Sequence, residues 1–145
     1  MSEQQERYNP ARRKSRRRAL DVLYQADLRG DVAAADVLRQ TLERMGRDRP
    51  EHMDYAVSLV EGVTAHAGRI DELLASFAEG WTLERMPPVD RNLARIAVYE
   101  LIYRDDIDDP VAISEAVELA RELSTDDSPR FLNGLLDRIA QYATR

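Results

Sequence analysis

A run of basic residues near the start of the chain carries the clearest chemical signal in the sequence. Six of the seven residues from Arg12 to Arg18 are basic, and only Ser15 interrupts them. Guanidinium groups form paired hydrogen bonds with phosphate oxygens, so clustered arginines are typical of surfaces that hold nucleic acid. The run leads directly into a segment with the apolar period of a helix, which would present these side chains from one rigid element.

A helical wheel sorts this first segment into two groups of residues. One stripe is predicted to face the core: Ser15, Ala19, Val22, Leu23 and Ala26. The second group lies well off that stripe and is predicted to be an exposed flank: Arg13, Arg17, Leu20, Tyr24 and Leu28. A tyrosine among arginines can stack an unpaired base, and the leucines can add apolar contact with a partner. The flank therefore predicts a docking strip for single-stranded RNA, with a solvated or packed basic helix as the alternative.

Charge is distributed unevenly along the chain. Residues 1–18 hold seven basic and two acidic residues, a net charge of +5, whereas residues 19–145 hold 14 basic and 25 acidic residues, a net charge of −11. Such segregation lets one patch attract a polyanion while the acidic remainder of the surface repels indiscriminate binding.

Signals for catalysis or metal binding are weak. His52 and His66 lie outside any HExxH motif, and the four aspartates in the segment DDIDDP lack the spacing and glycine of a calcium loop. The absence of cysteine excludes disulfides and thiol catalysis. We therefore expect a protein that is not an enzyme, without a cofactor or a metal site.

Glu100 is a carboxylate that the helical period turns toward the core, on the arc between Leu93 and Ile96. A buried carboxylate must be paired or hydrogen-bonded. A small hydrolase could use Glu100 or the aspartate cluster as acid or base, but no His, Cys or Lys accompanies Glu100. We favour a structural carboxylate that joins helices.

The helical period recurs almost throughout the chain, and no strand pattern stands out. The sequence predicts an all-α fold with seven helices in a single domain over residues 11–145, after a flexible tail over residues 1–10. The helices are expected at 11–29, 35–45, from Pro50 through Val63, around 70–77, at 88–104, at 111–123 and from Ser128–Pro129 onward. Gly134 is predicted to mark a close approach of two helices. Trp81 is predicted to anchor a hydrophobic seam between the two halves, with a partner-facing role as the alternative. No apolar run approaches the ~20 residues of a membrane span, so a soluble cytoplasmic protein is expected.

Four segments of the chain form an ordered set of motifs: RRRALDVLYQADL, WTLERMPPVDRNLARIAVYEL, VAISEAVELAR and DDSPRFLNGLLDRIA. In this order they resemble the sequence blocks of the NusB family of bacterial transcription antitermination factors. The resemblance covers residues 16–140 and is most specific in the C-terminal blocks, whereas residues 30–78 match only in helical character.

The resemblance implies a fold, a role and partners. The fold would be an N-terminal three-helix part packed against a C-terminal four-helix part. Members of the family act without catalysis: they pair with NusE, which is ribosomal small-subunit protein ten, on the single-stranded boxA element of nascent ribosomal RNA. The assembly makes RNA polymerase resist termination and supports ribosome biogenesis.

The resemblance also implies roles for individual residues of this chain. RNA contact would fall to Arg12, Arg13, Lys14, Arg16, Arg17, Arg18 and Tyr24, and to the loop residues Asp126, Asp127 and Ser128 with Phe131 beside them. The surface toward NusE would involve Asp90, where relatives usually have glutamate, together with Leu20 and Tyr24.

Two alternatives remain at this stage. The chain could be a helical homo-oligomeric module for protein–protein contact, whose basic segment is incidental. Some relatives self-associate and cover their RNA face, so a homodimer could also be a storage form of the RNA-binding protein.

Overall fold

The computed structural model describes residues 9–143, which form seven α-helices and two short 3-10 helices and contain no strand. The α-helices are α2 (Pro10–Arg29), α3 (Ala34–Met45), α4 (Met53–Ala65), α5 (Ala67–Phe77), α6 (Pro88–Tyr103), α7 (Asp109–Leu123) and α8 (Ser128–Ala143). The 3-10 helices are η1 (Gly46–Asp48) and η2 (Leu83–Arg85). The predicted all-α fold with seven helices is confirmed. Among these helices, none is both long and apolar enough to cross a membrane.

Capping residues set both ends of α2. The side-chain oxygen of Asn9 accepts a hydrogen bond from the backbone amide of Arg12, and Pro10 occupies the first position of the helix, where its missing N–H costs nothing. Gly30 ends the helix in the left-handed conformation, with φ of 73°. Asn9 and Pro10 thus belong to the start of α2 rather than to the predicted tail. The rest of that predicted tail, residues 1–8, lies outside the described residues.

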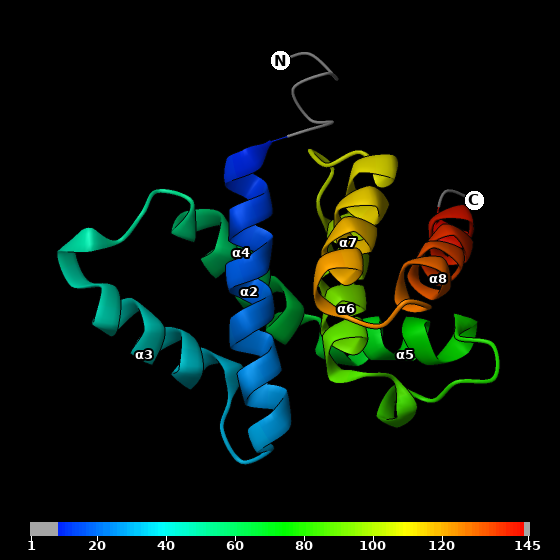
Figure 1. Cartoon of the computed structure of the whole chain (residues 1–145), viewed down its shortest axis with the longest axis horizontal. Coiled ribbons are helices and arrows are strands. Elements are labelled where there is room, and N and C mark those ends of the chain that lie inside the picture. Colours follow the sequence, from blue (N-terminus) through cyan, green and yellow to red (C-terminus); the bar gives the residue numbers. More distant parts are fainter. Residues whose placement is uncertain (1–8, 144–145) are drawn as a thin grey trace.

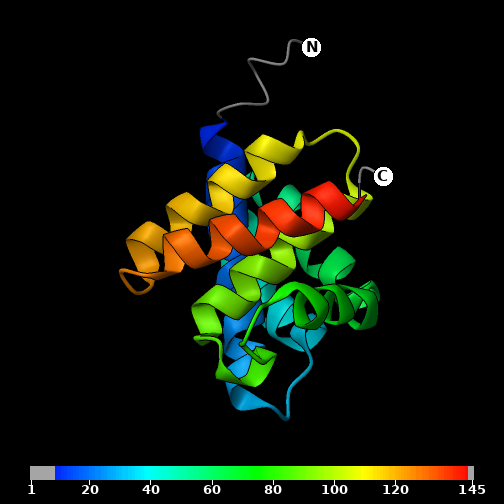
Figure 2. The same ribbon diagram turned by 90° about the vertical axis from the view of Figure 1, so that its right-hand side faces the viewer.

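The helices form two parts, as the resemblance implied. Figure 1 shows α2, α3 and α4 on one side and α5, α6, α7 and α8 on the other. Helices α2 and α4 pack against each other, and both contact α6. Helices α7 and α8 lie side by side over α6, as Figure 2 shows. Helix α6 is therefore the element that joins the two parts.

The hydrophobic core is continuous across both parts. Leu93, Ala94, Ile96, Ala97 and Val98 of α6 are all buried in it. A helix that is apolar on most sides must be surrounded by other helices, which explains the central place of α6. The core fixes α2 and α7 next to each other, and that juxtaposition determines the site described below.

The ring of Tyr99 on α6 packs directly against Gly62 of α4. A Cβ atom at this position would lie 2.1 Å from Cζ of Tyr99, which is far inside van der Waals contact. The prediction of a close helix approach at Gly134 is wrong, since the nearest atom to a Cβ there is Nη1 of the flexible Arg138 side chain, at 3.3 Å. Both glycines lie inside helices, but only Gly62 faces an aromatic ring of another helix, that of Tyr99.

We predict that Gly62→Ala destabilises the protein by about 1–3 kcal/mol, because the added methyl group must displace the Tyr99 ring and overpack the helix contact. The matched control is Gly68→Ala, where no atom lies within 4 Å of the added Cβ. That variant should gain about 0.5 kcal/mol from higher helix propensity. Urea denaturation measures both, and equal stability of the two variants would contradict the close approach.

Candidate nucleic-acid interface

The six basic residues at the start of α2 occupy three different environments. Arg16 is buried, with 3% of its surface exposed. Arg12 and Arg13 are half-buried. Lys14, Arg17 and Arg18 are exposed. About two helical turns of basic sequence therefore supply both an internal cation and a charged surface.

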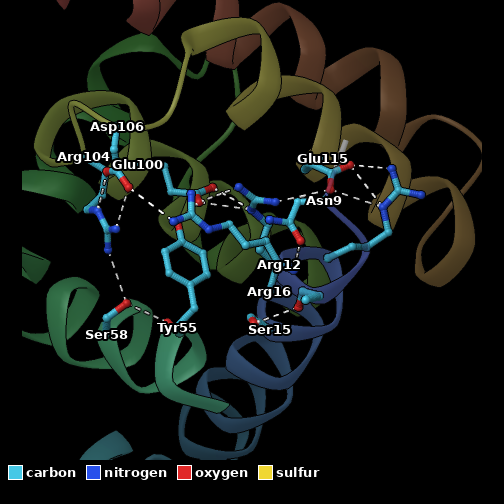
Figure 3. A network of polar contacts seen from close by, with 12 residues as sticks. Asn9, Arg12, Ser15, Arg16, Tyr55, Ser58, Glu100, Arg104, Asp106 and Glu115 are labelled. Carbon is cyan, nitrogen blue, oxygen red and sulfur yellow. Dashed lines mark hydrogen bonds and ion pairs between the residues drawn. The ribbon is translucent and has the colours of Figure 1, made fainter. Parts of the chain in front are cut away.

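Arg16 is the centre of a buried polar network, drawn in Figure 3. Its Nε and Nη2 atoms donate to the carboxylate of Glu100 at 3.0 and 2.8 Å, and its Nη1 atom donates to Glu115 at 3.2 Å. The hydroxyl of Tyr55 also donates to Glu100. The four side chains come from α2, α6, α7 and α4, so one network ties four helices together.

This network decides two of the sequence predictions. Glu100 is a paired structural carboxylate, as expected, because both of its oxygen atoms accept hydrogen bonds from Arg16 and one also accepts from Tyr55. The assignment of Arg16 to RNA contact is wrong, because its guanidinium lies inside the protein and is bound to two carboxylates. The sequence did not distinguish Arg16 from its neighbours, since all six residues share one charge.

The network is held in one charge state. Burial raises the pKa of Tyr55, and the adjacent Glu100 carboxylate raises it further, so its hydroxyl keeps its proton. Burial acts to lower the pKa of Arg16, but the charge and hydrogen bonds of Glu100 outweigh burial and leave the pKa raised. A charged guanidinium thus faces charged acceptors, which is the arrangement that compensates burial best.

Arg12 extends the network toward the surface. Its guanidinium lies over the Tyr55 ring, 4.5 Å from the centroid, and its Nη2 contacts Asp106 at 3.4 Å. Arg104 lies 4.9 Å from the same ring centroid and binds Asp106 at 2.9 Å. The hydrogen bond from Arg104 is the largest cause that lowers the pKa of Asp106. Arg12 therefore helps to hold α2 against the α6–α7 turn and is only partly open to a ligand.

Arg13 and Arg17 form a row on α2 that faces α7. The Nε of Arg13 donates to the buried Glu115 at 3.1 Å. One turn further along, Nη2 of Arg17 contacts Glu122 at 2.8 Å, and both of these side chains are about half exposed. Both arginines of the predicted flank thus have carboxylate partners on α7.

Lys14 and Arg18 form a second row, on the side of α2 toward the start of α4. Neither makes an ion pair within residues 9–143. They lie close enough to His52 to act on its titration: burial is the largest cause that lowers the pKa of His52, and the charges of Arg18 and Lys14 lower it further. Between them, Ser15 is buried and donates to the backbone oxygens of Ala11 and His52.

The apolar half of the predicted flank is only partly exposed. Leu28 is exposed and Tyr24 is half-buried. Leu20 is only 3% exposed and belongs to the core. Leu20 was predicted to lie on the exposed flank and on the surface toward NusE, and its burial makes both predictions wrong. The reason is that α2 packs against both α4 and α6, which buries a wider arc than one apolar stripe.

The loop between α7 and α8 is fixed by a buried carboxylate. Asp90, at the start of α6, accepts hydrogen bonds from Ser124 at 2.5 Å and Ser128 at 2.8 Å. Asp90 and Ser128 are both buried, so the predictions that their side chains contact a partner and RNA directly are wrong. Asp126 and Asp127 of the same loop are exposed. Asp90 instead positions this loop beside α6.

A groove with a volume of about 590 Å³ opens next to this loop. Its lining includes Trp81, Met86, Pro87 and Phe131, and the Trp81 ring meets Phe131 edge-on with 6.0 Å between centroids. Trp81 is 49% exposed, so the prediction that it anchors an internal seam is wrong. The structure instead gives an aromatic pair in the lining of the groove, formed by the exposed Trp81 and the half-buried Phe131.

A second polar network was not predicted from the sequence. Asp27, near the end of α2, accepts hydrogen bonds from Arg91 and Asn92 of α6, each at 2.8 Å, and Arg95 binds Asp71 of α5 at 2.9 Å. Burial acts to raise the pKa of Asp27, but the hydrogen bonds from Arg91 and Asn92 outweigh it and lower the pKa. The four-residue spacing of Arg91 and Arg95, which puts both on one helix face, was the available signal.

Among residues 9–143, no group of three or more side chains is arranged to hold a metal ion. The described surface carries exposed cations on α2, a fixed loop with two exposed aspartates, and a groove lined in part by aromatic side chains. The comparison with known proteins agrees with this description. The model of the NusB family matches residues 13–141. The chain belongs to the NusB family.

Relatives and solved structures support the assignment over nearly the whole chain. The transcription antitermination protein NusB of Salinispora tropica is 72% identical over 136 residues, which cover 94% of this chain and 99% of the relative. The structure of T. maritima NusB has a TM-score of 0.82 at 33% identity and covers 92% of this chain and 93% of its own. A crystal structure of the antitermination factors NusB and NusE in complex with dsRNA has a TM-score of 0.80 at 25% identity, over 93% of this chain and 99% of the other.

We predict that Glu100→Gln lowers the free energy of unfolding by about 3 kcal/mol, because it removes the charge that compensates the buried Arg16. The control is Glu72→Gln, which changes an exposed carboxylate paired with Arg69 and should cost less than about 1 kcal/mol. Urea denaturation followed by circular dichroism measures both variants. A Glu100→Gln protein as stable as the control would show that the network contributes little.

Proposed function

We propose that this chain is a non-catalytic, cytoplasmic adaptor that binds single-stranded boxA-type RNA together with NusE and promotes antitermination by RNA polymerase on ribosomal RNA operons. The observation that carries the proposal is the exposed cationic surface of α2, formed by Lys14, Arg17 and Arg18 in a chain with a net charge of −6. The membership of the chain in a family of antitermination factors supports the same role.

The arrangement of α2 suits a single strand. The helix is held by Arg16 on its inner side, so its outer cations are presented without the cost of ordering a flexible segment. From Lys14 to Tyr24 the helix axis rises about 15 Å, which is enough for several successive phosphates. The half-buried ring of Tyr24 offers a face for an unpaired base near the end of this stretch.

The groove beside the α7–α8 loop is the surface we assign to NusE. The resemblance pointed to Asp90 at the start of α6, and the groove opens around that carboxylate. Its exposed Trp81 and half-buried Phe131 are the kind of aromatic side chains that anchor protein–protein contacts. Asp90 contributes by holding Ser124 and Ser128 in place, while the aromatic pair makes the contact.

We predict that the triple variant Lys14→Ala, Arg17→Ala, Arg18→Ala weakens binding to a boxA RNA oligonucleotide roughly tenfold at moderate salt. The slope of log affinity against log salt concentration should become less negative by about 2, because three phosphate contacts to a single strand are lost. Fluorescence anisotropy across a salt series measures both quantities.

The control for this variant is Arg39→Ala, Arg44→Ala, Arg47→Ala, which removes the same charge from exposed positions on α3 and η1. It should leave the salt dependence close to that of the parent chain. If the two triple variants bind alike, only net charge matters, and the alternative of a homo-oligomeric protein–protein module gains support.

We predict that Trp81→Ala weakens binding to NusE about tenfold and leaves binding to RNA alone unchanged, because it truncates an exposed anchor of the groove. Tyr142→Ala, which truncates another exposed aromatic residue outside the groove, is the control. Isothermal titration calorimetry with purified NusE measures the effect. Unchanged affinity of Trp81→Ala for NusE would remove the groove from the proposed interface.

A further inference from the structure

Three arginine–glutamate contacts join α2 to α7, and the two glutamates that receive them differ in how firmly they are held. Glu115, the partner of Arg13, is 2% exposed and also accepts a hydrogen bond from the buried Arg16. A carboxylate with two cationic partners and no access to water cannot move aside without exposing a buried charge. The contact between Arg13 and Glu115 is therefore a fixed part of the fold.

Glu122 is held much less firmly. Its carboxylate contacts Arg17 at 2.8 Å, and the two side chains are 49% and 48% exposed. Among the described residues no other ion pair or side-chain hydrogen bond holds Glu122. Rotation of its side chain into water would free the guanidinium of Arg17 at little cost, since both charged groups are already solvated.

We propose that Glu122 is a built-in competitor that occupies the guanidinium of Arg17 until an RNA phosphate displaces it, and so sets the affinity of the α2 surface for RNA. The proposal rests on the function proposed above and names the residue that tunes it. Carboxylate and phosphate oxygens accept hydrogen bonds from the same guanidinium N–H groups, so the two cannot occupy one edge of Arg17 together.

The size of the effect follows from the exposure of the pair. Exposed ion pairs are weak, and the strength of such a contact corresponds to about two- to fivefold in a binding constant. RNA can therefore displace Glu122, but every strand that uses Arg17 binds less tightly by that factor. Removal of the carboxylate should tighten binding most at low salt, because salt screens both the contact and the repulsion between Glu122 and the strand.

The test compares Glu122→Gln with Glu118→Gln. Both variants remove one negative charge from α7, and the two glutamates are similarly exposed, at 49% and 44% of the side chain. Glu118 contacts Arg121 of its own helix and not α2. The probe is a fluorescein-labelled boxA RNA oligonucleotide, followed by anisotropy at low and at physiological salt, with an oligouridine of equal length as a second probe.

We expect Glu122→Gln to tighten binding of both probes about two- to fivefold at low salt and Glu118→Gln to change it less than about 1.5-fold. The same Glu122→Gln change in an Arg17→Ala background should tighten binding no more than Glu118→Gln does, because the guanidinium for which Glu122 competes is absent and only the general charge effect remains. Equal tightening by the two glutamine variants, or greater tightening by Glu122→Gln that persists without Arg17, would overturn the proposal in favour of a general charge effect.

The design separates this proposal from the proposed function. If Arg17→Ala weakens RNA binding while Glu122→Gln leaves it unchanged, the α2 surface binds RNA and the competitor is refuted. If Arg17→Ala leaves RNA binding unchanged, the assignment of Arg17 to the RNA surface fails first, and the competitor fails with it.

Discussion

The buried ion pair between Arg16 and Glu100 is the interaction on which the rest of the structure depends. Removing a guanidinium and a carboxylate from water is costly unless each is fully compensated. Here the compensation comes from four helices: Arg16 on α2, Tyr55 on α4, Glu100 on α6 and Glu115 on α7. The network therefore fixes the position of α2 against both α6 and α7.

The basic residues of α2 thus both hold the helix in place inside the protein and present positive charge at its surface. Arg16 holds the helix, Arg12 and Arg13 pair with acidic side chains at the boundary, and three cations lie at the surface, of which Arg17 contacts Glu122. The internal use makes the external one effective, since a rigid helix presents its charges in a constant geometry. The same logic applies at the other end of the surface, where the buried Asp90 fixes the loop that carries the exposed Asp126 and Asp127.

The fold was largely predictable from the sequence, and the site only in part. Helical periodicity and end signals such as Gly30 located the helices, because these signals depend on local sequence alone. Whether the side chains of Arg16 and Leu20 are buried depends on which helices pack against α2, and no local sequence pattern contains that information. The buried role of Glu100 was predictable because the helical period places it on the core-facing arc between Leu93 and Ile96. The role of Asp90 was not, because Ser124 and Ser128 approach it from distant sequence.

The two rows of cations on α2 have a consequence for the path of a bound strand. Arg13 and Arg17 lie toward α7, whereas Lys14 and Arg18 lie toward the start of α4, and adjacent residues of a helix are separated by about 100° around its axis. If RNA binds this surface as proposed, a strand along one flank of α2 reaches only one row, and a strand that engages both rows must lie along the ridge between them or cross it. Contact with both rows would therefore select the path of the RNA backbone over the helix.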